Sequence, residues 1–127
     1  MNEPKKLIDT PSQTAGPFLH IGCAPRITGI NIFKSELGLT PFQDISDNEA
    51  INIKGKIYDG NGEPIIDAMI ETWQCDANGN YSSNQGFARI VTDFKTGEYQ
   101  LKTIRPGNKI NTHESLSASY ITFWIVA

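Results

Sequence analysis

Residues 51–74 read INIKGKIYDGNGEPIIDAMIETWQ, and this stretch decides the fold. Over residues 51–57, isoleucines and a glycine alternate with asparagine and lysines, which is the period of a half-buried strand. The tetrad DGNG at 59–62 is a strong turn signal. Residues 64–74 follow as a second long segment of strand character. The stretch therefore predicts a strand–turn–strand unit in a β-rich domain.

Three more strands are expected further along the chain, at residues 87–94, 99–104 and 119–127. The last of them, SYITFWIVA, is apolar at nearly every position, which predicts a central place in a sheet. No helical pattern of about 12 residues appears in the chain. Strands at regular spacing, joined by glycine-rich turns, predict an all-β sandwich.

The N-terminal segment has a different character. Residues 10–22, TPSQTAGPFLHIG, show almost no periodicity and predict neither a regular helix nor a strand. Two prolines fix φ, a glycine lets another group approach the backbone, and the segment ends in apolar side chains that favour burial. We therefore expect residues 1–25 to form an extended docking arm and residues 26–127 to form the sandwich domain.

Length, composition and charge exclude several classes of protein. The chain has 127 residues, which suits one domain, and 39% of them are hydrophobic. Eleven basic residues against 14 acidic ones give a net charge of −3, so we expect no nucleic-acid partner. No segment approaches the roughly 18 apolar residues of a membrane span. The first residues, MNEPKKL, lack an apolar signal core, which predicts a cytoplasmic protein.

The end of the chain is unusual for a complete domain. Ala127 stands within an apolar strand, with no turn or polar cap after it. We expect the sandwich to be incomplete at its C-terminus, either as a fragment or as a natural truncation.

Few side chains show the spacing of a reactive site. Cys23 and Cys75 are far apart and are expected to be free thiols that are at least partly buried. His20 and His113 lack metal-ligand spacing to each other or to a cysteine. The residues alone show no zinc motif, phosphate loop, nucleophile elbow or clear catalytic triad.

Larger side chains are expected to have structural roles. Trp73 and Trp124 are predicted to lie in the core. Glu71 and Asp76 are separated by a strand end and a turn, so they do not form a convincing acid/base pair. Arg89 and Arg105 are suited to attract an anionic aromatic acid, but exposed arginines usually have no specific role.

Residues 71–81, ETWQCDANGNY, resemble the signature of the intradiol ring-cleavage dioxygenases: E-x-W-Q/H, a short turn, then G-x-Y. The arm segment TPSQTAGPF and the stretch FARIVTDFKTGEYQLKTIRPG at 87–107 resemble the same family. This resemblance implies a prealbumin-like β-sandwich. It also implies that Tyr81 stands where catalytic members place an iron ligand.

The resemblance breaks down at the other ligand positions. The family holds Fe(III) with two tyrosines and two histidines, because ferric iron favours anionic oxygen donors. Here the Pro-Gly turn is followed by Asn108, and Tyr120 and Thr122 stand where histidines are expected. The resemblance therefore implies a vestigial ligand position at Tyr81, no metal site and no catalytic residue in this chain.

The function implied by the resemblance is that of a non-catalytic alpha subunit in a hetero-oligomer. Fe(III) would be bound by the partner beta subunit, and the complex would cleave protocatechuate with O2 to 3-carboxy-cis,cis-muconate. The arm would line the mouth of the partner's pocket through five substrate-binding residues: Thr14, Ala15, Gly16, Pro17 and Phe18.

Two alternatives remain open from the residues themselves. One is a stand-alone prealbumin-like module that binds or builds without catalysis, as the sandwich pattern and the missing ligands allow. The other is a truncated, non-functional product, whose exposed apolar strand edge would favour aggregation.

Overall fold

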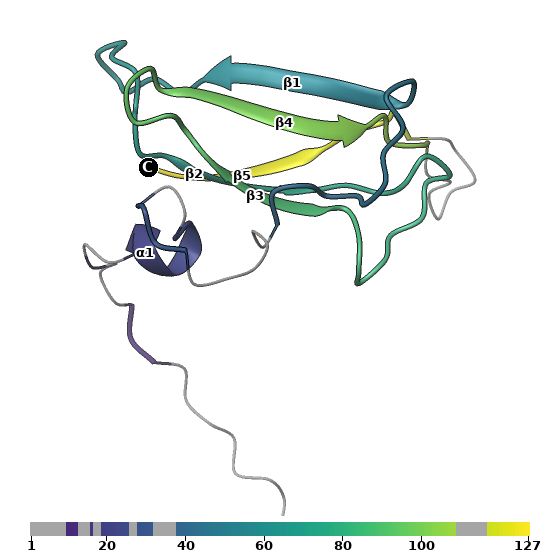
Figure 1. Cartoon of the computed structure of the whole chain (residues 1–127), viewed down its shortest axis with the longest axis horizontal. Helices are drawn as coiled ribbons and strands as arrows, with labels where there is room; N and C mark the ends of the chain where they lie inside the picture. The colour runs from purple at the N-terminus through teal and green to yellow at the C-terminus, as the bar shows by residue number, and fades with distance from the viewer. Residues whose placement is uncertain (1–9, 13–15, 17–18, 26–27, 32–37, 109–116) are drawn as a thin grey trace, which may run out of the picture.

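The computed structural model describes residues 10–12, 16, 19–25, 28–31, 38–108 and 117–127. Within these ranges five strands and one short helix are present, and the strands form two antiparallel sheets. The sheets lie over one another as two layers, with the helix below the lower layer (Figure 1). The predicted all-β sandwich is confirmed.

The first sheet pairs β1 (Ala50–Lys56) with β4 (Glu98–Ile104), and Ile53 lies opposite Leu101. Alternate residues of β1 are half-buried, as the period of two predicted. Gly55 lies opposite Tyr99, and a Cβ at Gly55 would come within 2.7 Å of the Tyr99 hydroxyl oxygen. The tyrosine ring can cover the strand only because residue 55 has no side chain.

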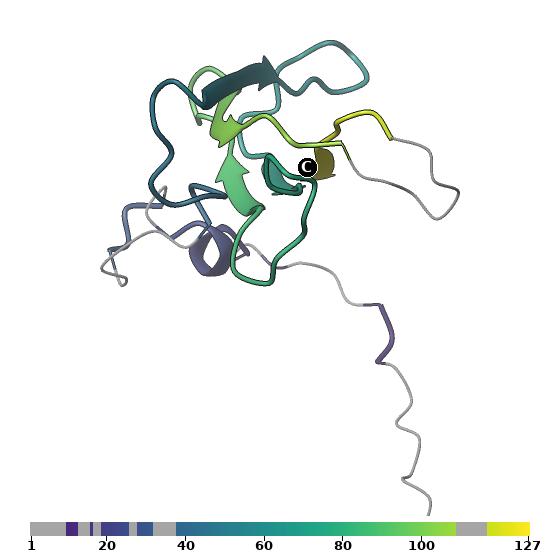
Figure 2. The ribbon, with the colours of Figure 1, turned by 90° about the vertical axis from the view of Figure 1, so that its right-hand side faces the viewer.

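The second sheet has the order β3 (Phe87–Val91), β2 (Met69–Trp73), β5 (Thr122–Val126). Its inner face packs against the first sheet, as the end-on view shows (Figure 2). The core consists of four buried residues with a ring of half-buried neighbours. The buried residues are Ile70, Ala88, Ile90 and Leu101, and the neighbours are Ile53, Ile57, Tyr99 and Phe123.

The prediction of a central C-terminal strand is wrong. In the described sheet β2 is central, and β5 pairs with β2 alone. The expected burial of the tryptophans is also wrong, because Trp73 is 38% exposed and Trp124 is 64% exposed. An apolar run shows that side chains avoid water, but it does not show how many neighbours a strand has. Here Phe123 packs against the core, whereas Trp124 and Ile125 of β5 are exposed.

Two further boundaries differ from the prediction. β2 begins at Met69, and Pro64 forms only an isolated bridge with Tyr58, because proline has no N–H to donate to a ladder. Leu19–Cys23 forms a five-residue helix, α1, within the segment expected to lack regular structure. One helical turn is too short to show a 3.6-residue period in the sequence.

The cysteine prediction is confirmed, since Cys23 is half-buried, Cys75 is buried and both are free. Across the described ranges, no helix has the length and apolar content needed to cross a membrane.

Candidate functional site

Tyr81 directly follows a tightly bonded turn. The Asp76 carboxylate accepts the backbone N–H groups of Asn78 and Asn80, both at 2.8 Å. The Gly79 N–H donates to the Asp76 carbonyl at 3.1 Å, with Gly79 at φ 83°. These hydrogen bonds, that from Asn80 above all, hold the pKa of Asp76 below its usual value. The turn therefore fixes the backbone that carries Tyr81.

The Pro-Gly turn after β4 packs directly on this first turn. The Gly107 N–H donates to the Asp76 carbonyl at 2.8 Å, and the Cys75 thiol donates to the Gly107 carbonyl at 3.4 Å. A Cβ at Gly107 would collide with the carbonyl oxygen of Ala77. The glycine is needed because the two backbones approach so closely.

The tyrosines at two expected ligand positions lie together. The hydroxyl oxygens of Tyr81 and Tyr120 are 3.0 Å apart, and the Trp73 ring stacks on Tyr81 with a 5.9 Å centroid separation. The hydrogen bond with Tyr120, followed by burial, raises the pKa of Tyr81 to about 12. Tyr81 is therefore a protonated phenol at neutral pH.

Gln74, the last residue of the E-x-W-Q motif, joins the two sheets at this end of the sandwich. Its side-chain N–H groups donate to the carbonyls of Ile104 (3.0 Å) and Cys75 (3.3 Å). Its side-chain oxygen accepts the Thr103 hydroxyl at 2.7 Å. Sequence reasoning read Gln74 only as part of the motif. The available signal was a polar residue at the end of an apolar strand, beside a buried cysteine.

The outer face of the three-stranded sheet carries a charged pair. Arg89 donates from Nε (2.8 Å) and Nη2 (2.6 Å) to one carboxylate oxygen of Glu71, and its guanidinium lies 5.8 Å from the Phe87 ring centre. Glu71 thus binds Arg89, while Asp76 caps a turn, so these two acids do not act as a pair. Arg89 is therefore paired with Glu71, and its attraction of an anionic acid stays a prediction.

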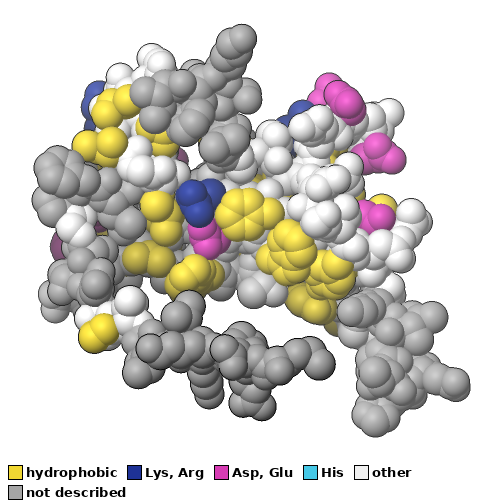
Figure 3. Space-filling model, turned by 90° about the horizontal axis from the view of Figure 1, so that it is seen from below, with side chains coloured by type: hydrophobic (Ala, Val, Ile, Leu, Met, Phe, Trp, Pro, Cys, Tyr) yellow, Lys and Arg dark blue, Asp and Glu magenta, His cyan; other side chains and the backbone are white. Residues whose placement is uncertain are grey.

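Exposed aromatic side chains surround this pair. By strand register, Trp73 and Phe87 lie side by side, and Trp124 lies beside Glu71. Figure 3 shows hydrophobic side chains gathered next to a basic and an acidic one on this side of the molecule. We call Trp73, Phe87, Tyr120 and Trp124 the aromatic face; their exposed fractions are 38%, 39%, 49% and 64%.

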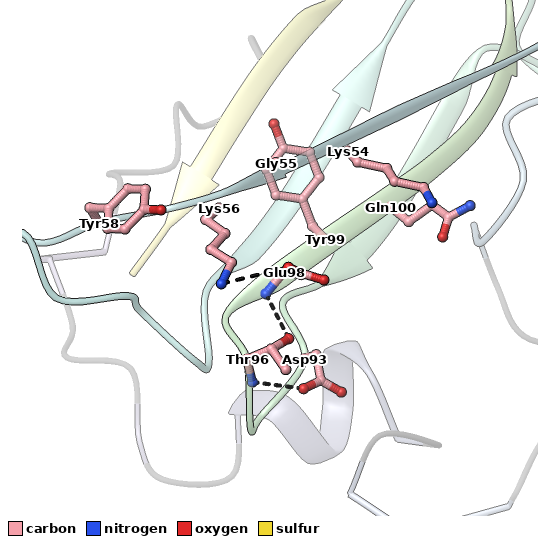
Figure 4. Close-up of a pocket in the computed structure, with 9 residues that line it drawn as sticks. All are labelled: Lys54, Gly55, Lys56, Tyr58, Asp93, Thr96, Glu98, Tyr99 and Gln100. Atoms are coloured by element: carbon pink, nitrogen blue, oxygen red, sulfur yellow. Dashed lines mark hydrogen bonds and ion pairs between the residues drawn. The ribbon is translucent and has the colours of Figure 1, made fainter.

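A groove of about 720 Å³ lies elsewhere, on the first sheet (Figure 4). Lys54, Lys56 and Glu98 line it, and the Lys56 ammonium lies 3.6 Å from the Glu98 carboxylate. The groove is lined by charges of both signs and contains neither Tyr81 nor Tyr120. It is therefore separate from the candidate site.

The arm assignment cannot be followed in full. Thr14, Ala15, Pro17 and Phe18 lie outside the described residues. Gly16 is exposed, with open space where a Cβ would stand. Its substrate-binding role, and the boundary between arm and domain at residues 25 and 26, stay predictions.

The family described as "Dioxygenase" matches residues 34–122 of the chain. The chain is also 39% identical, over 108 residues, to the protocatechuate 3,4-dioxygenase alpha chain of Pseudomonas putida. This match covers 80% of the chain and 54% of the relative. The chain belongs to the intradiol dioxygenase family.

A second curated relative agrees with this membership, and a solved structure shares the fold. The protocatechuate 3,4-dioxygenase alpha chain of Burkholderia cepacia is 32% identical over 111 residues, covering 80% of this chain and 56% of that relative. The chain thus spans about half the length of the curated relatives it matches. Catechol 1,2-dioxygenase from Pseudomonas arvilla C-1 superposes with a TM-score of 0.61 at 19% identity, covering 69% of this chain and 35% of that structure, and it shares the fold.

Intradiol dioxygenases are non-heme iron enzymes, but the side chains around Tyr81 do not fit ferric iron. The Tyr81 and Tyr120 hydroxyls bond to each other, and the Asn108 amide oxygen accepts the Ser119 hydroxyl at 2.7 Å. Within the described ranges, no group of three or more His, Cys, Asp or Glu side chains is placed to hold a metal. Of the other side chains at the expected ligand positions, Asn108 and Thr122 offer only an amide and an aliphatic hydroxyl, which are weak ligands for a hard trivalent cation.

Proposed function

We propose that this chain is the alpha subunit of a protocatechuate 3,4-dioxygenase, with the Fe(III) bound by a beta partner. The observation that carries the proposal is the hydrogen-bonded phenol pair at the signature tyrosine. The chain thus has the signature segment of the family, but its side chains at the ligand positions do not form a set that fits ferric iron. The 39% identity to an alpha chain supports the same assignment.

In the proposed complex both atoms of O2 are added to protocatechuate, and the bond between the two hydroxylated ring carbons breaks to give 3-carboxy-cis,cis-muconate. The partner's iron supplies the activation of the catechol. This chain contributes its arm, in which residues 14–18 close the mouth of the pocket, exclude water and orient the ring.

The aromatic face has the composition of a contact surface. Tryptophan, tyrosine and phenylalanine are enriched in the cores of protein–protein interfaces. Here Trp124 is 64% exposed next to the Glu71–Arg89 pair, which has little room to be hydrated because Glu71 is only 15% exposed. A surface of this kind gains free energy when a second chain covers it.

Co-expression with an intradiol beta chain tests the proposal. The chain alone should be colourless and inactive, and the co-purified complex should contain iron and cleave protocatechuate. A chain that purifies with no beta partner, and adds nothing to the beta chain's activity, would favour the stand-alone module.

The arm can be tested within the same complex. Gly16→Trp should leave assembly intact and raise KM for protocatechuate, because its open position receives a bulky side chain near the pocket mouth. Gly60→Trp is the matched control, since Gly60 also has open space around it but lies in the 59–62 turn. Equal kinetics for the two variants would refute the role of the arm.

A further inference from the structure

We propose that the Tyr81–Tyr120 hydrogen bond is a metal-free clamp that continues the pairing of β2 with β5 beyond the end of their ladder. The ladder's backbone pairing ends where Trp73 lies opposite Thr122. Beyond that point the chain after β2 turns away through residues 76–80. The two hydroxyl oxygens, 39 residues apart in sequence, nevertheless lie 3.0 Å apart. The clamp thus joins the turn that follows β2 to the segment that precedes β5.

Backbone hydrogen bonds fix the turn that carries Tyr81. Asp76 accepts three backbone hydrogen bonds within the turn, from Asn78, Asn80 and Gly79, and the Gly107 N–H adds a fourth from the segment after β4. Gly107 is in turn linked to the buried Cys75 through the thiol hydrogen bond. The turn that carries Tyr81 is therefore hydrogen-bonded to segments that follow strands of both sheets.

Trp73 orients the ring. Its indole lies nearly parallel to the Tyr81 ring, with an interplanar angle of 21°. Because Trp73 is the last residue of β2, this stack holds the Tyr81 ring along the sheet, with its hydroxyl directed toward the β5 side. Three aromatic side chains from three segments thus form one cluster, with the Tyr81–Tyr120 hydrogen bond at its end.

In the clamp, Tyr120 is a hydrogen-bond partner of Tyr81 and not a metal ligand. A tyrosine ligates ferric iron as a phenolate through the same oxygen that forms this hydrogen bond. The Tyr120 hydroxyl is directed at Tyr81 and is therefore already engaged. The substitution of the expected histidine by Tyr120 therefore changes the position from a ligand into a structural contact.

A double-mutant cycle on the full chain tests the clamp. Tyr81→Phe and Tyr120→Phe keep both rings and the Trp73 stack but remove one hydroxyl each. Each is expected to raise the unfolding equilibrium constant about threefold, a modest effect because Tyr120 is 49% exposed. The double variant should be no less stable than either single one. Tyr58→Phe, at an exposed tyrosine outside the cluster, is the control and should change nothing.

Two local readouts separate the clamp from a general loss of stability. Amide hydrogen exchange should accelerate in residues 76–82 and 117–122 of either variant, but not in β1 or β4. Wild-type chain mixed with ferric iron should show no tyrosinate-to-iron absorption band. Additive effects in the cycle, exchange that accelerates uniformly, or an iron band that Tyr81→Phe abolishes would each overturn the proposal. Neither readout needs a beta chain, so the result is independent of the proposed enzyme function.

Discussion

Replacing Gln74 by methionine should destabilise the chain more than any other single polar substitution at this end of the sandwich. The side chain is 1% exposed and makes three hydrogen bonds, to Thr103, Ile104 and Cys75. Methionine has nearly the same length and volume, so packing is conserved while the three partners lose their hydrogen bonds. A buried group left without its partner costs about 1 kcal/mol or more, which gives a total of about 3 kcal/mol.

Urea unfolding followed by tryptophan fluorescence measures this loss. A change of about 3 kcal/mol is about a hundredfold in the unfolding equilibrium constant. It should lower the urea midpoint by about 2 M at a slope of about 1.5 kcal/mol per M. Gln100→Met is the matched control, because Gln100 is exposed and has only a long, 3.5 Å contact with Asn52. A Gln74→Met loss no larger than that of the control would show that the amide does not join the two sheets.

Two other perturbations have clear signs. Thr72→Val should leave stability unchanged or raise it by up to about 1 kcal/mol, because the buried Thr72 hydroxyl has no hydrogen-bond partner among the residues that the structure describes; a loss above that size in thermal unfolding would reveal a partner. The pKa of Asp76 lies below 3.8 in the folded chain, so the carboxylate stabilises the fold above about pH 4, and this contribution is lost as pH falls through the lowered pKa. Asp76→Asn should therefore flatten the fall in thermal midpoint between pH 5 and about pH 2, and an unchanged pH profile would contradict the capping role.

Strand positions were readable from the sequence because local pattern determines them. Alternation over residues 51–57 anticipated β1 to within one residue at each end, since one face of that strand is buried and the other is wet. Glycines in the turns carried equally direct information. Gly79 and Gly97 adopt positive φ, at 83° and 67°, where other residues are strained.

The order of strands was not readable in the same way. β5 is the most apolar segment and yet pairs with β2 alone among the described strands, whereas β2, with Glu71 in its middle, has a neighbour on each side. Glu71 tolerates that position because Arg89 on the neighbouring strand neutralises it on the outer face. This neutralisation depends on the register that places Arg89 beside Glu71, 18 residues earlier in the chain. Composition and local pattern do not reveal such a register.

The candidate site shows the same division. Sequence reasoning placed Tyr81 at the family's tyrosine-ligand position and Tyr120 where a histidine is expected, but it could not show that their hydroxyls meet. That contact depends on the Trp73 stack and on the register of β5 against β2. The hydrogen-bonding role of Gln74 was missed for a related reason, since its partners lie 29 and 30 residues away on β4.

Two turns with the same local sequence make this point most directly. Residues 59–63 and 76–80 both follow the pattern D-x-N-G-x, and in each the aspartate accepts N–H groups two and four residues later. Their local structure is therefore the same, and so is the lowered pKa of the capping aspartate. The first turn has open space around Gly62, whereas the second receives Gly107 and carries Tyr81. The local sequence specifies the structure of both turns. Only the turn at 76–80 becomes part of the candidate site, because the distant segment at Gly107 packs on it.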